Sequence, residues 1–399
     1  MTMGLLPPRL GDRSLFPDLE PAAYLAHAAV SPPSIALRRA VIGHLGDLAR
    51  RGAGAFGAAV EQRARLRAKL ESFINAPAGA VAIVQNTSLG VTEVALSIPW
   101  RPGDRVVLLR GEFPANVTPW QRAAALFSLD VVWCDADLWR TDPEAARAQL
   151  TAALSRGARV VAVSAVQFQT GHRMPLRAIS DLARDAGAEL FVDAIQGLGA
   201  VPLDVEAEGI DHLASGGHKW LMGVEGAGLL YARHPERHAP HLAGWLSHEE
   251  AFSFLSEGAG RLRYDRAFRD DALRFEGGTP NAAGCVALET SLDILAALTP
   301  SAIYAHVNAY LDALEAPLVE RGFTSLRAKD PAGRSCILSV LPPEGAPDAP
   351  AMQRALASRG VVASCPDGYL RFAPHWPNDA ARELPAVLAA VDAVLKTPG

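Results

Sequence analysis

Short β-rich runs alternate with helix-like segments through the first two-thirds of the chain, and this order constrains the fold more than any other feature. The segments between the runs, such as 143–154 and 176–186, repeat apolar residues at helical spacing. Strands that alternate with helices form mostly parallel sheets with helices on both faces. The sequence therefore predicts an α/β domain. The β-rich runs lie at residues 81–84, 105–109, 131–134, 160–166 and 190–193.

The pattern changes after about residue 278. Two long helical patterns, 282–298 and 303–319, are followed by strand candidates and a final helix. A chain of 399 residues is long enough for two domains. We expect residues 30–281 to form the large α/β domain and residues 282–399 to form a smaller α+β domain. The N-terminal segment 1–29 is expected to belong to the smaller domain. The later strand candidates are 336–341, 360–364 and 369–372, and the last helix covers 380–395.

Composition excludes several classes of protein. The chain is 49% hydrophobic and carries a formal net charge of -5, without the clustered basic surface that a nucleic-acid partner requires. No apolar stretch approaches the length of a membrane span, and residues 1–10 lack the basic and apolar segments of a secretory signal. The four cysteines are scattered, with no Cys-x-x-Cys pair. We expect a cytoplasmic protein with no nucleic-acid or membrane partner and no metal site.

Lys219 lies in the sequence Ser-Gly-Gly-His-Lys-Trp at 215–220, between a strand that ends at Asp193 and the apolar run 226–232. Neighbouring glycines and flanking strands are typical of a lysine held inside a site. Burial would lower the pKa of its amine, and a neutral amine attacks an aldehyde to form a Schiff base. We therefore predict a covalently bound aldehyde cofactor; the alternative is an ordinary solvated lysine.

Polar side chains follow four of the predicted strands. Because ligands bind outside the carboxyl ends of the strands in open α/β sheets, these residues are expected to converge on one crevice. They are Thr87 and Ser88 after the first strand, Ser164 and Gln167 after a later one, Asp193 and Gln196 after another, and the residues from Ser215 to Lys219.

Thr87 and Ser88 come between a strand and an amphipathic run, which places their hydroxyls and backbone amides at a helix N-terminus. Such a terminus binds phosphate through its dipole and its free N–H groups. An ordinary helix cap is the alternative, because Ser and Thr are preferred there in any case.

Asp193 ends an apolar strand, where a carboxylate is costly unless something compensates for its burial. A protonated pyridine nitrogen would do so, and the charged ring would then act as an electron sink for a carbanion formed at the substrate. Gln196 is positioned one turn later to hydrogen-bond a phenolic oxygen of that ring. The alternative for Asp193 is a helix N-cap.

Taken together, Asp193, Gln196 and the 215–220 segment resemble the pyridoxal-phosphate site of fold-type-I enzymes in the class V aminotransferase group. That group includes cysteine desulfurases, selenocysteine lyases and isopenicillin N epimerase-like proteins. The resemblance implies a fold-type-I architecture, pyridoxal 5'-phosphate as cofactor and an α-amino acid as substrate. Lys219 and Asp193 would be the catalytic residues, with Lys219 forming the Schiff base.

The resemblance extends to the segment 112–116, which is similar to the group's Glu-His-x-Ala-Asn. Phe113 would stack on the cofactor ring in place of that histidine, but a phenyl ring can neither accept nor donate a proton. The remaining residues follow from the same resemblance. We assign Gln167, Ser215 and His218 to the cofactor, and Asn116 and His27 to the substrate.

Two further motifs extend the resemblance towards the C-terminus. Thr279 lies in Gly-Thr-Pro-Asn, through which related enzymes reach the phosphate of the neighbouring subunit; this implies a homodimer. Arg371 ends a predicted strand, and the family's arginine there grips the substrate carboxylate through two parallel hydrogen bonds. A simple turn and a surface ion pair are the respective alternatives.

The reaction type is less constrained. Desulfurases of this group use a cysteine on a flexible loop well before the arginine, whereas Cys365 is only six positions from Arg371. We therefore expect no persulfide on the protein. Transamination, epimerisation and β-elimination with C–S cleavage stay open, as does a non-catalytic cofactor-binding role. A nucleotide-binding fold is disfavoured because no Gly-x-Gly-x-x-Gly follows the first strand.

Overall fold

The computed structural model describes residues 7–396. Residues 1–6 and 397–399, which belong to the expected small domain, lie outside the described residues, as does most of the stretch inspected for a secretory signal.

A seven-stranded sheet forms the centre of the molecule, in the order β2-β8-β7-β6-β5-β3-β4. The pairs from β7 through β6, β5 and β3 to β4 are parallel, and β8 is antiparallel to both of its neighbours. The expected mostly parallel sheet is confirmed. Its strands are β2 (Val81–Val84), β3 (Arg105–Arg110), β4 (Asp130–Asp135), β5 (Val160–Ser164), β6 (Glu189–Asp193), β7 (His212–Gly216) and β8 (Gly228–Ala232).

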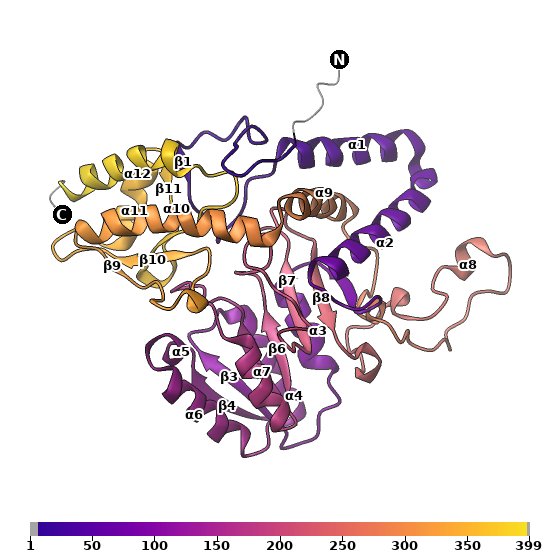
Figure 1. Ribbon diagram of the computed structural model, residues 1–399. Helices are drawn as coiled ribbons and strands as arrows, with labels where there is room; N and C mark the ends of the chain where they lie inside the picture. Colours follow the sequence, from indigo (N-terminus) through magenta and orange to yellow (C-terminus); the bar gives the residue numbers. More distant parts are fainter. Residues whose placement is uncertain (1–6, 397–399) are drawn as a thin grey trace.

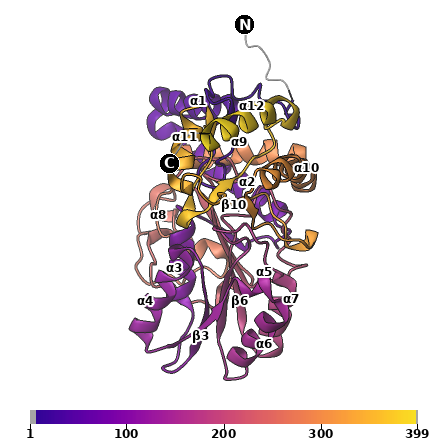
Figure 2. The same cartoon turned by 90° about the vertical axis from the view of Figure 1, so that its left-hand side faces the viewer.

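Helices cover both faces of this sheet (Figure 2). Consecutive strand residues face different hydrophobic clusters: Val106 and Leu108 pack on the side of α3 and α4, whereas Val107 and Leu109 pack with α6 and α7. Burial on both faces explains why the central strands are continuous apolar runs rather than alternating ones. The covering helices are α3 (Thr87–Ser97) and α4 (Thr118–Phe127) on one face, and α5 (Leu138–Thr141), α6 (Pro143–Leu154) and α7 (Leu176–Asp185) on the other.

Two long helices near the N-terminus, α1 (Ile35–Arg51) and α2 (Phe56–Phe73), lie against α9 (Ala282–Leu298). They extend to one end of the molecule, beside a projecting segment that contains α8 (Ser253–Ser256) (Figure 1). Neither α1 nor α2 was anticipated from the sequence.

The C-terminal part builds a smaller unit around an antiparallel sheet, β12-β10-β9. A separate two-stranded parallel sheet pairs β1 with β11, so the N-terminal segment is bonded to the C-terminal part. This pairing supports the division into 30–281 and 282–399 plus the N-terminal segment, which stays a prediction. The elements are β1 (Ala23–Tyr24), α10 (Pro300–Glu320), β9 (Thr324–Ser325), β10 (Leu338–Leu341), α11 (Ala349–Ala357), β11 (Val361–Val362), β12 (Leu370–Phe372) and α12 (Ala380–Leu395).

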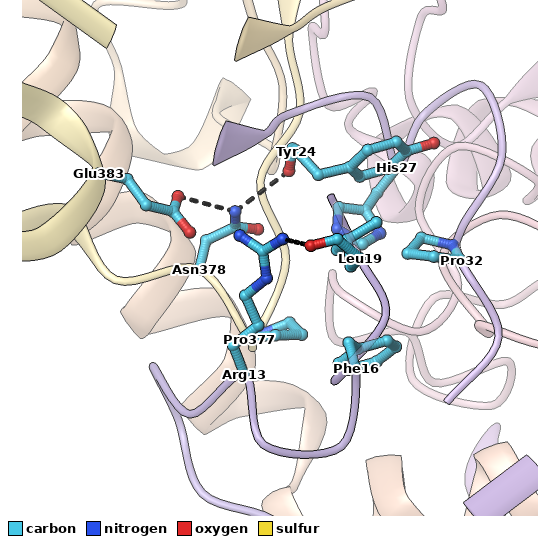
Figure 3. Close-up of a pocket in the computed structure, with 9 residues that line it drawn as sticks. All are labelled: Arg13, Phe16, Leu19, Tyr24, His27, Pro32, Pro377, Asn378 and Glu383. Carbon is cyan, nitrogen blue, oxygen red and sulfur yellow. Dashed lines mark hydrogen bonds between the residues drawn. The ribbon is translucent and has the colours of Figure 1, made fainter. Parts of the chain in front are cut away.

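Side chains reinforce this attachment of the N-terminal segment (Figure 3). The amide of Asn378 donates to the carbonyl of Tyr24 at 3.1 Å and to the carboxylate of Glu383 at 2.9 Å. Arg13 donates to the carbonyl of Leu19 beside them. The cavity that these residues enclose has a volume of only about 10 Å³, which is no more than one water molecule requires.

Some predicted strands differ from the observed ones, each for a local reason. The run 160–166 ends as a strand at Ser164, because the chain then turns and Val166 bridges back to Arg173. The strand predicted over 336–341 begins only at Leu338, and Ile337 before it packs against the backbone of Gly171. Strand β7 was missed because His-Leu-Ala-Ser-Gly carries little β-branched character.

No single helix within residues 7–396 has the length and apolarity to cross a membrane. Helices α9 and α10 meet that criterion only when combined across a bend of 77°.

The backbone of Gly199 lies directly against the carbonyl of Trp220, next to Lys219. Its φ is +114°, and a Cβ at this position would come within 2.2 Å of the Trp220 oxygen. The loop that carries Lys219 therefore depends on a glycine 20 residues upstream.

We expect Gly199→Ala to lower the free energy of unfolding by about 3 kcal/mol or more, because backbone strain and a collision with backbone add together. Gly187→Ala is the matched control: its φ is +73°, but no atom lies within 4 Å of its Cβ position. Strain alone should cost about 1 kcal/mol there. Equal losses for both variants in urea denaturation would show that the Trp220 contact does not matter.

Candidate active site

The carboxyl ends of β3, β5, β6 and β7, which are neighbours in the sheet, bring polar residues together. The predicted segments after β5, β6 and β7 meet here, and Thr87, which follows β2, joins them through Gly216. Ser164 of β5 is in register with Asp193 of β6, and Asp193 is in register with Ala214 of β7. Glu112 follows β3, the strand on the other side of β5, and contacts Ser164. The site therefore lies at one edge of the sheet.

Lys219 lies in the loop after β7, largely withdrawn from solvent. Its Nζ is 5.6 Å from the centroid of the Phe113 ring. Burial lowers the pKa of the Lys219 amine to about 8; the charge of Asp193 acts in the opposite direction, and that of Arg371 adds to the lowering. About one-tenth of the amine is therefore uncharged at pH 7, far more than for an ordinary lysine, and nucleophilic attack on an aldehyde requires the uncharged form.

Asp193 is 1% exposed and has one carboxylate oxygen without a partner. Its Oδ1 accepts the N–H of Ile195 at 3.0 Å, but Oδ2 receives no hydrogen bond from any residue in 7–396. No helix begins at Asp193, so the helix-cap alternative is wrong. Burial raises the pKa of the Asp193 carboxyl to about 7, and the nearby Glu112 contributes to the increase. A buried acceptor without a donor indicates a missing partner, and a pyridine N–H fits it.

Glu112 forms a buried network behind Asp193. It accepts hydrogen bonds from the backbone N–H of Ser164 at 2.8 Å and from Gln167 at 3.0 Å, as well as from the Ser164 hydroxyl and from Asn116. Burial raises the pKa of the Glu112 carboxyl, while these donors act to lower it. No role was predicted for Glu112, although a charged residue just after a buried strand is a signal that the sequence contains.

Phe113, Phe168 and Arg371 form one wall of the site. The rings of Phe113 and Phe168 meet edge to face at 5.3 Å, and Phe113 is 44% exposed, so its face is accessible to a ligand. Arg371 donates through Nη1 to the carbonyl of Phe168 at 2.6 Å and through Nε to the Ser364 hydroxyl at 2.9 Å. Its Nη2 has no acceptor within residues 7–396, which leaves it available for a carboxylate. Nothing in the sequence indicated a role for Phe168.

Thr87 and Ser88 are the first two residues of α3, where the predicted phosphate site lies. The cap itself is Asn86, whose side chain accepts the N–H of Leu89 at 2.9 Å. Thr87 Oγ1 accepts the N–H of Gly216 at 2.8 Å, which ties this helix terminus to the end of β7. The imidazole of His218 lies over Gly216, as a Cβ there would be 3.1 Å from its Nδ1.

The N-terminal segment supports the Lys219 loop from behind. Ser31 donates through its hydroxyl to the Lys219 carbonyl at 2.6 Å and through its backbone N–H to the His218 carbonyl at 2.9 Å. His27 contacts the Ser31 hydroxyl at 2.8 Å, so it reaches Lys219 only through Ser31. His375 bonds the carbonyl of Trp220 at 2.9 Å. His27 is 2% exposed, and this geometry makes it a supporting residue rather than a substrate contact.

Gln196 is buried with its amide engaged by the protein. Its Nε2 donates to the carbonyl of Ala28 at 3.0 Å, and its Oε1 accepts from the Trp220 indole at 3.1 Å. One amide hydrogen is left for the phenolic oxygen of a ring, so the predicted contact stays a prediction.

Three residues assigned to a ligand make hydrogen bonds within the protein. Asn116 is fully buried, and both of its side-chain atoms are bonded, to Glu112 and to Trp120. The side-chain amide of Gln167 donates a hydrogen bond to Glu112. Ser215 is 1% exposed, and its hydroxyl donates to the carbonyl of Gly216. Asn116 therefore holds the site together rather than contacting a substrate. Gln167 keeps a second amide hydrogen and the Ser215 oxygen can still accept, so their predicted contacts with the cofactor stay predictions.

Thr279 lies apart from this group, exposed in the loop before α9. Within residues 7–396 it makes no contact with the site, which agrees with the expectation that it serves a second subunit but does not test it.

Comparison with known proteins identifies the family. The profile of the family described as aminotransferase class-V matches residues 40–362. An uncharacterized aminotransferase of Bacillus subtilis (strain 168), YcbU, is 27% identical over 368 residues, which cover 92% of this chain and 93% of that protein. A cysteine desulfurase of Dickeya dadantii (strain 3937) is 31% identical over 329 residues, or 80% and 76% of the two chains.

Among solved structures, the cystine C–S lyase C-DES in complex with its reaction product cysteine persulfide superposes with a TM-score of 0.85. The match covers 94% of this chain and 99% of that one at 22% identity. The protein thus belongs to the aminotransferase class-V family. It has the fold-type-I architecture expected from the sequence, and the cofactor of this family is pyridoxal phosphate.

The burial of Asp193 predicts a pH-dependent cost in the cofactor-free protein. Its folded pKa lies above the unfolded value, so the stability that its protonated form provides is complete below about pH 4 and is lost as pH rises through about 7. The loss amounts to up to about 4 kcal/mol.

We therefore expect the melting temperature of cofactor-free wild type to fall relative to that of Asp193→Asn between pH 4 and pH 8. The neutral amide does not titrate, so calorimetry of both proteins isolates the carboxylate. A constant difference across this range would contradict the assignment. Addition of pyridoxal phosphate should stabilise wild type more than the variant.

Proposed function

We propose that this protein uses pyridoxal phosphate to cleave the Cβ–S bond of a sulfur-containing α-amino acid of the cystine or cysteine type. The observation that carries the proposal is the grouping of three functions: the amine of Lys219 over the ring of Phe113, and the Oδ2 of Asp193 and the free Nη2 of Arg371, two residues whose charges both act on that amine.

The residues present fit the cofactor, which when bound withdraws electrons from the α-carbon of an attached amino acid. Asp193 Oδ2, which has no partner within residues 7–396, would accept a hydrogen bond from a ring N–H and so favour the charged ring. Phe113 offers a stacking surface, and the N-terminus of α3 with Thr87 and Ser88 offers a phosphate site. Lys219 supplies the amine for the aldehyde.

Arg371 and Lys219 have different roles toward the substrate. Arg371 is 4% exposed, so its free Nη2 binds a carboxylate in a site with little competing water. Burial lowers the pKa of this guanidinium to about 10, and a bound carboxylate would offset that loss of charge stability. Lys219, uncharged in part at neutral pH, would act as the base toward the α-proton of a bound amino acid.

Elimination of a sulfur leaving group is favoured over the alternatives by the relatives and by the position of Cys365. The Dickeya dadantii relative is a cysteine desulfurase, and C-DES is a cystine C–S lyase. Cys365 precedes a short turn, Pro366–Gly368, and burial raises the pKa of its thiol, whereas a sulfur nucleophile requires a lowered one. The sulfur therefore leaves on the small molecule, as a persulfide from cystine, together with pyruvate and ammonia.

The test compares wild type with Lys219→Ala and Cys365→Ala on cystine. Wild type should be yellow and release pyruvate, ammonia and persulfide sulfur. Lys219→Ala should lose the covalent chromophore and at least about 10³-fold in kcat, because the amine acts on the α-proton directly. Cys365→Ala should keep kcat/KM within about twofold.

A loss of more than tenfold in Cys365→Ala would show that the cysteine carries the sulfur and would overturn that part of the proposal. A panel of other amino acids separates the remaining reaction types. Keto acid with amine transfer indicates transamination, and a racemised amino acid indicates an epimerase. A protein that takes up no pyridoxal phosphate would end the cofactor assignment.

We also propose a homodimer in which Thr279 reaches the neighbouring site. Helix α1 exposes an apolar stripe, Ile42 (68%), Leu45 (51%) and Leu48 (48%). The α8 segment lies at the same end of the molecule (Figure 1). The ring of its Phe252 meets the ring of Phe56 on α2, with 5.7 Å between the ring centroids. Exposed apolar surface of this extent is typical of a protein interface.

Sedimentation equilibrium should give twice the mass of one chain for wild type and a single chain for Ile42→Glu/Leu48→Glu. Leu126→Glu is the matched control, because Leu126 is 49% exposed on α4, away from this end. If Thr279 completes the neighbouring site, the monomeric variant should also bind pyridoxal phosphate at least tenfold more weakly. A monomeric wild type would overturn the proposal.

A further inference from the structure

The side chain of Lys219 is not held in place by a hydrogen bond of its own. Within residues 7–396 its Nζ lies over the ring of Phe113 and is acted on by the charges of Asp193 and Arg371, but it donates to no acceptor. A lysine has a flexible aliphatic stem, so the position of such an amine depends on how firmly its backbone is fixed. The bonds that hold the backbone of the Lys219 loop therefore bear on where the amine lies.

Three consecutive carbonyls of this loop accept hydrogen bonds from elsewhere in the chain. Ser31 donates from its N–H to the carbonyl of His218 at 2.9 Å and from its hydroxyl to that of Lys219 at 2.6 Å. His375 bonds the carbonyl of Trp220 at 2.9 Å. Ser31 is 4% exposed and His375 is fully buried, so water hardly competes for these contacts.

The hydroxyl of Ser31 is not needed to satisfy the carbonyl of Lys219. That carbonyl also accepts the N–H of Met222, inside the loop, at 2.9 Å. The Ser31 contact therefore fixes a position and does not rescue an unpaired group. It joins the loop to a segment that is 188 residues away in the chain.

Both histidines behind the loop have their proton on a defined nitrogen. The N–H of Trp376 donates to Nδ1 of His375 at 2.7 Å, so Nδ1 is the acceptor and Nε2 carries the proton that the loop receives. The Ser31 hydroxyl donates its one proton to the loop, so it accepts from Nδ1 of His27, 2.8 Å away. Burial lowers the pKa of both rings, that of His375 to about 4, which keeps them neutral at pH 7.

These holding residues belong to the part of the molecule that also carries Arg371. His375 comes four positions after Arg371, and the chain between them is bonded to the N-terminal segment. The N–H of Ala373 donates to the carbonyl of Leu25 at 2.7 Å, and its carbonyl accepts the N–H of His27 at 3.1 Å. One bonded unit thus holds the lysine loop and brings in the arginine.

We propose that Ser31 and His375 are positioning residues for Lys219, because their bonds to the loop hold its amine within reach of the cofactor's aldehyde carbon. In that step the uncharged amine adds to the carbon, and the aldehyde oxygen leaves as water with the two protons of the amine. The proposal rests on the Schiff-base role of Lys219 given above but not on the reaction that follows. A displaced amine forms the covalent bond less readily, whereas the non-covalent contacts of the cofactor involve other residues.

The test titrates the cofactor-free protein with pyridoxal 5'-phosphate and with pyridoxine 5'-phosphate. The second ligand has an alcohol in place of the aldehyde, so it forms no bond to the amine and reports only on the rest of the site. Ser31→Ala should raise the Kd of pyridoxal phosphate at least about fivefold and that of pyridoxine phosphate less than about twofold. Ser180→Ala is the control, because the buried Ser180 hydroxyl also donates to a backbone carbonyl, that of Gly209 at 2.6 Å, but on α7. It should change neither Kd more than about twofold.

Two replacements of His375 isolate its bond to Trp220, since each removes one hydrogen bond of the ring. Gln has an amide nitrogen near the position of Nε2 and keeps the donor to Trp220, whereas Asn has an oxygen near Nδ1 and keeps only the acceptor for Trp376. His375→Asn should therefore behave like Ser31→Ala, and His375→Gln should resemble wild type. A purely structural role for the ring would instead weaken both ligands to a similar extent in both variants.

Equal changes for the two ligands in Ser31→Ala and His375→Asn, or no change in either variant, would overturn the proposal. Lys219→Ala, which has no amine, should bind the two ligands alike. If wild type also binds them alike, the Schiff-base role of Lys219 fails, and the positioning role fails with it. If wild type prefers pyridoxal phosphate and the Ser31 and His375 variants keep that preference, only the positioning role is wrong.

Discussion

The parallel hydrogen bonding of β5, β6 and β7 is the constraint on which the site depends. It puts the carboxyl ends of these strands at one edge, so that residues far apart in the chain become neighbours without any flexible segment to align them. Glu112, Ser164, Asp193 and Gly216 are each placed by a strand whose two faces are buried. Rigid placement of this kind is what a site with an unpaired carboxylate requires.

The N-terminal segment and the C-terminal part close the site from the other side. Ser31 bonds the carbonyls of Lys219 and His218, while Arg371 is brought in by β12 and fixed on Phe168. The lysine and the arginine are thus held by different parts of the chain. Any change in how these parts are arranged alters the distance between the amine of Lys219 and the guanidinium of Arg371.

The sequence predicted the alternating architecture and the limits of the helices it named to within a few residues. It also singled out Lys219, Asp193 and Arg371, whose residue types are distinctive and which the structure brings into electrostatic contact. It did not predict the residues that act through ordinary contacts. Phe168 holds Arg371 with a backbone carbonyl, which any residue possesses, so its type carries no signal. Asn116 and Gln167 were assigned to ligands from the family resemblance, and in the structure both amides donate to Glu112. Side-chain direction depends on tertiary packing, which a motif does not encode.

The unpaired oxygen of Asp193 also bears on how long a copy of this protein survives. A chain that has folded without its cofactor keeps a buried acceptor that nothing in the polypeptide satisfies. Ligand binding to the folded state withdraws molecules from the unfolded pool by mass action, and unfolded molecules are the ones that proteases remove. The amount of this protein in a cell should therefore follow the supply of the vitamin from which the cofactor is made, even when its rate of synthesis is constant.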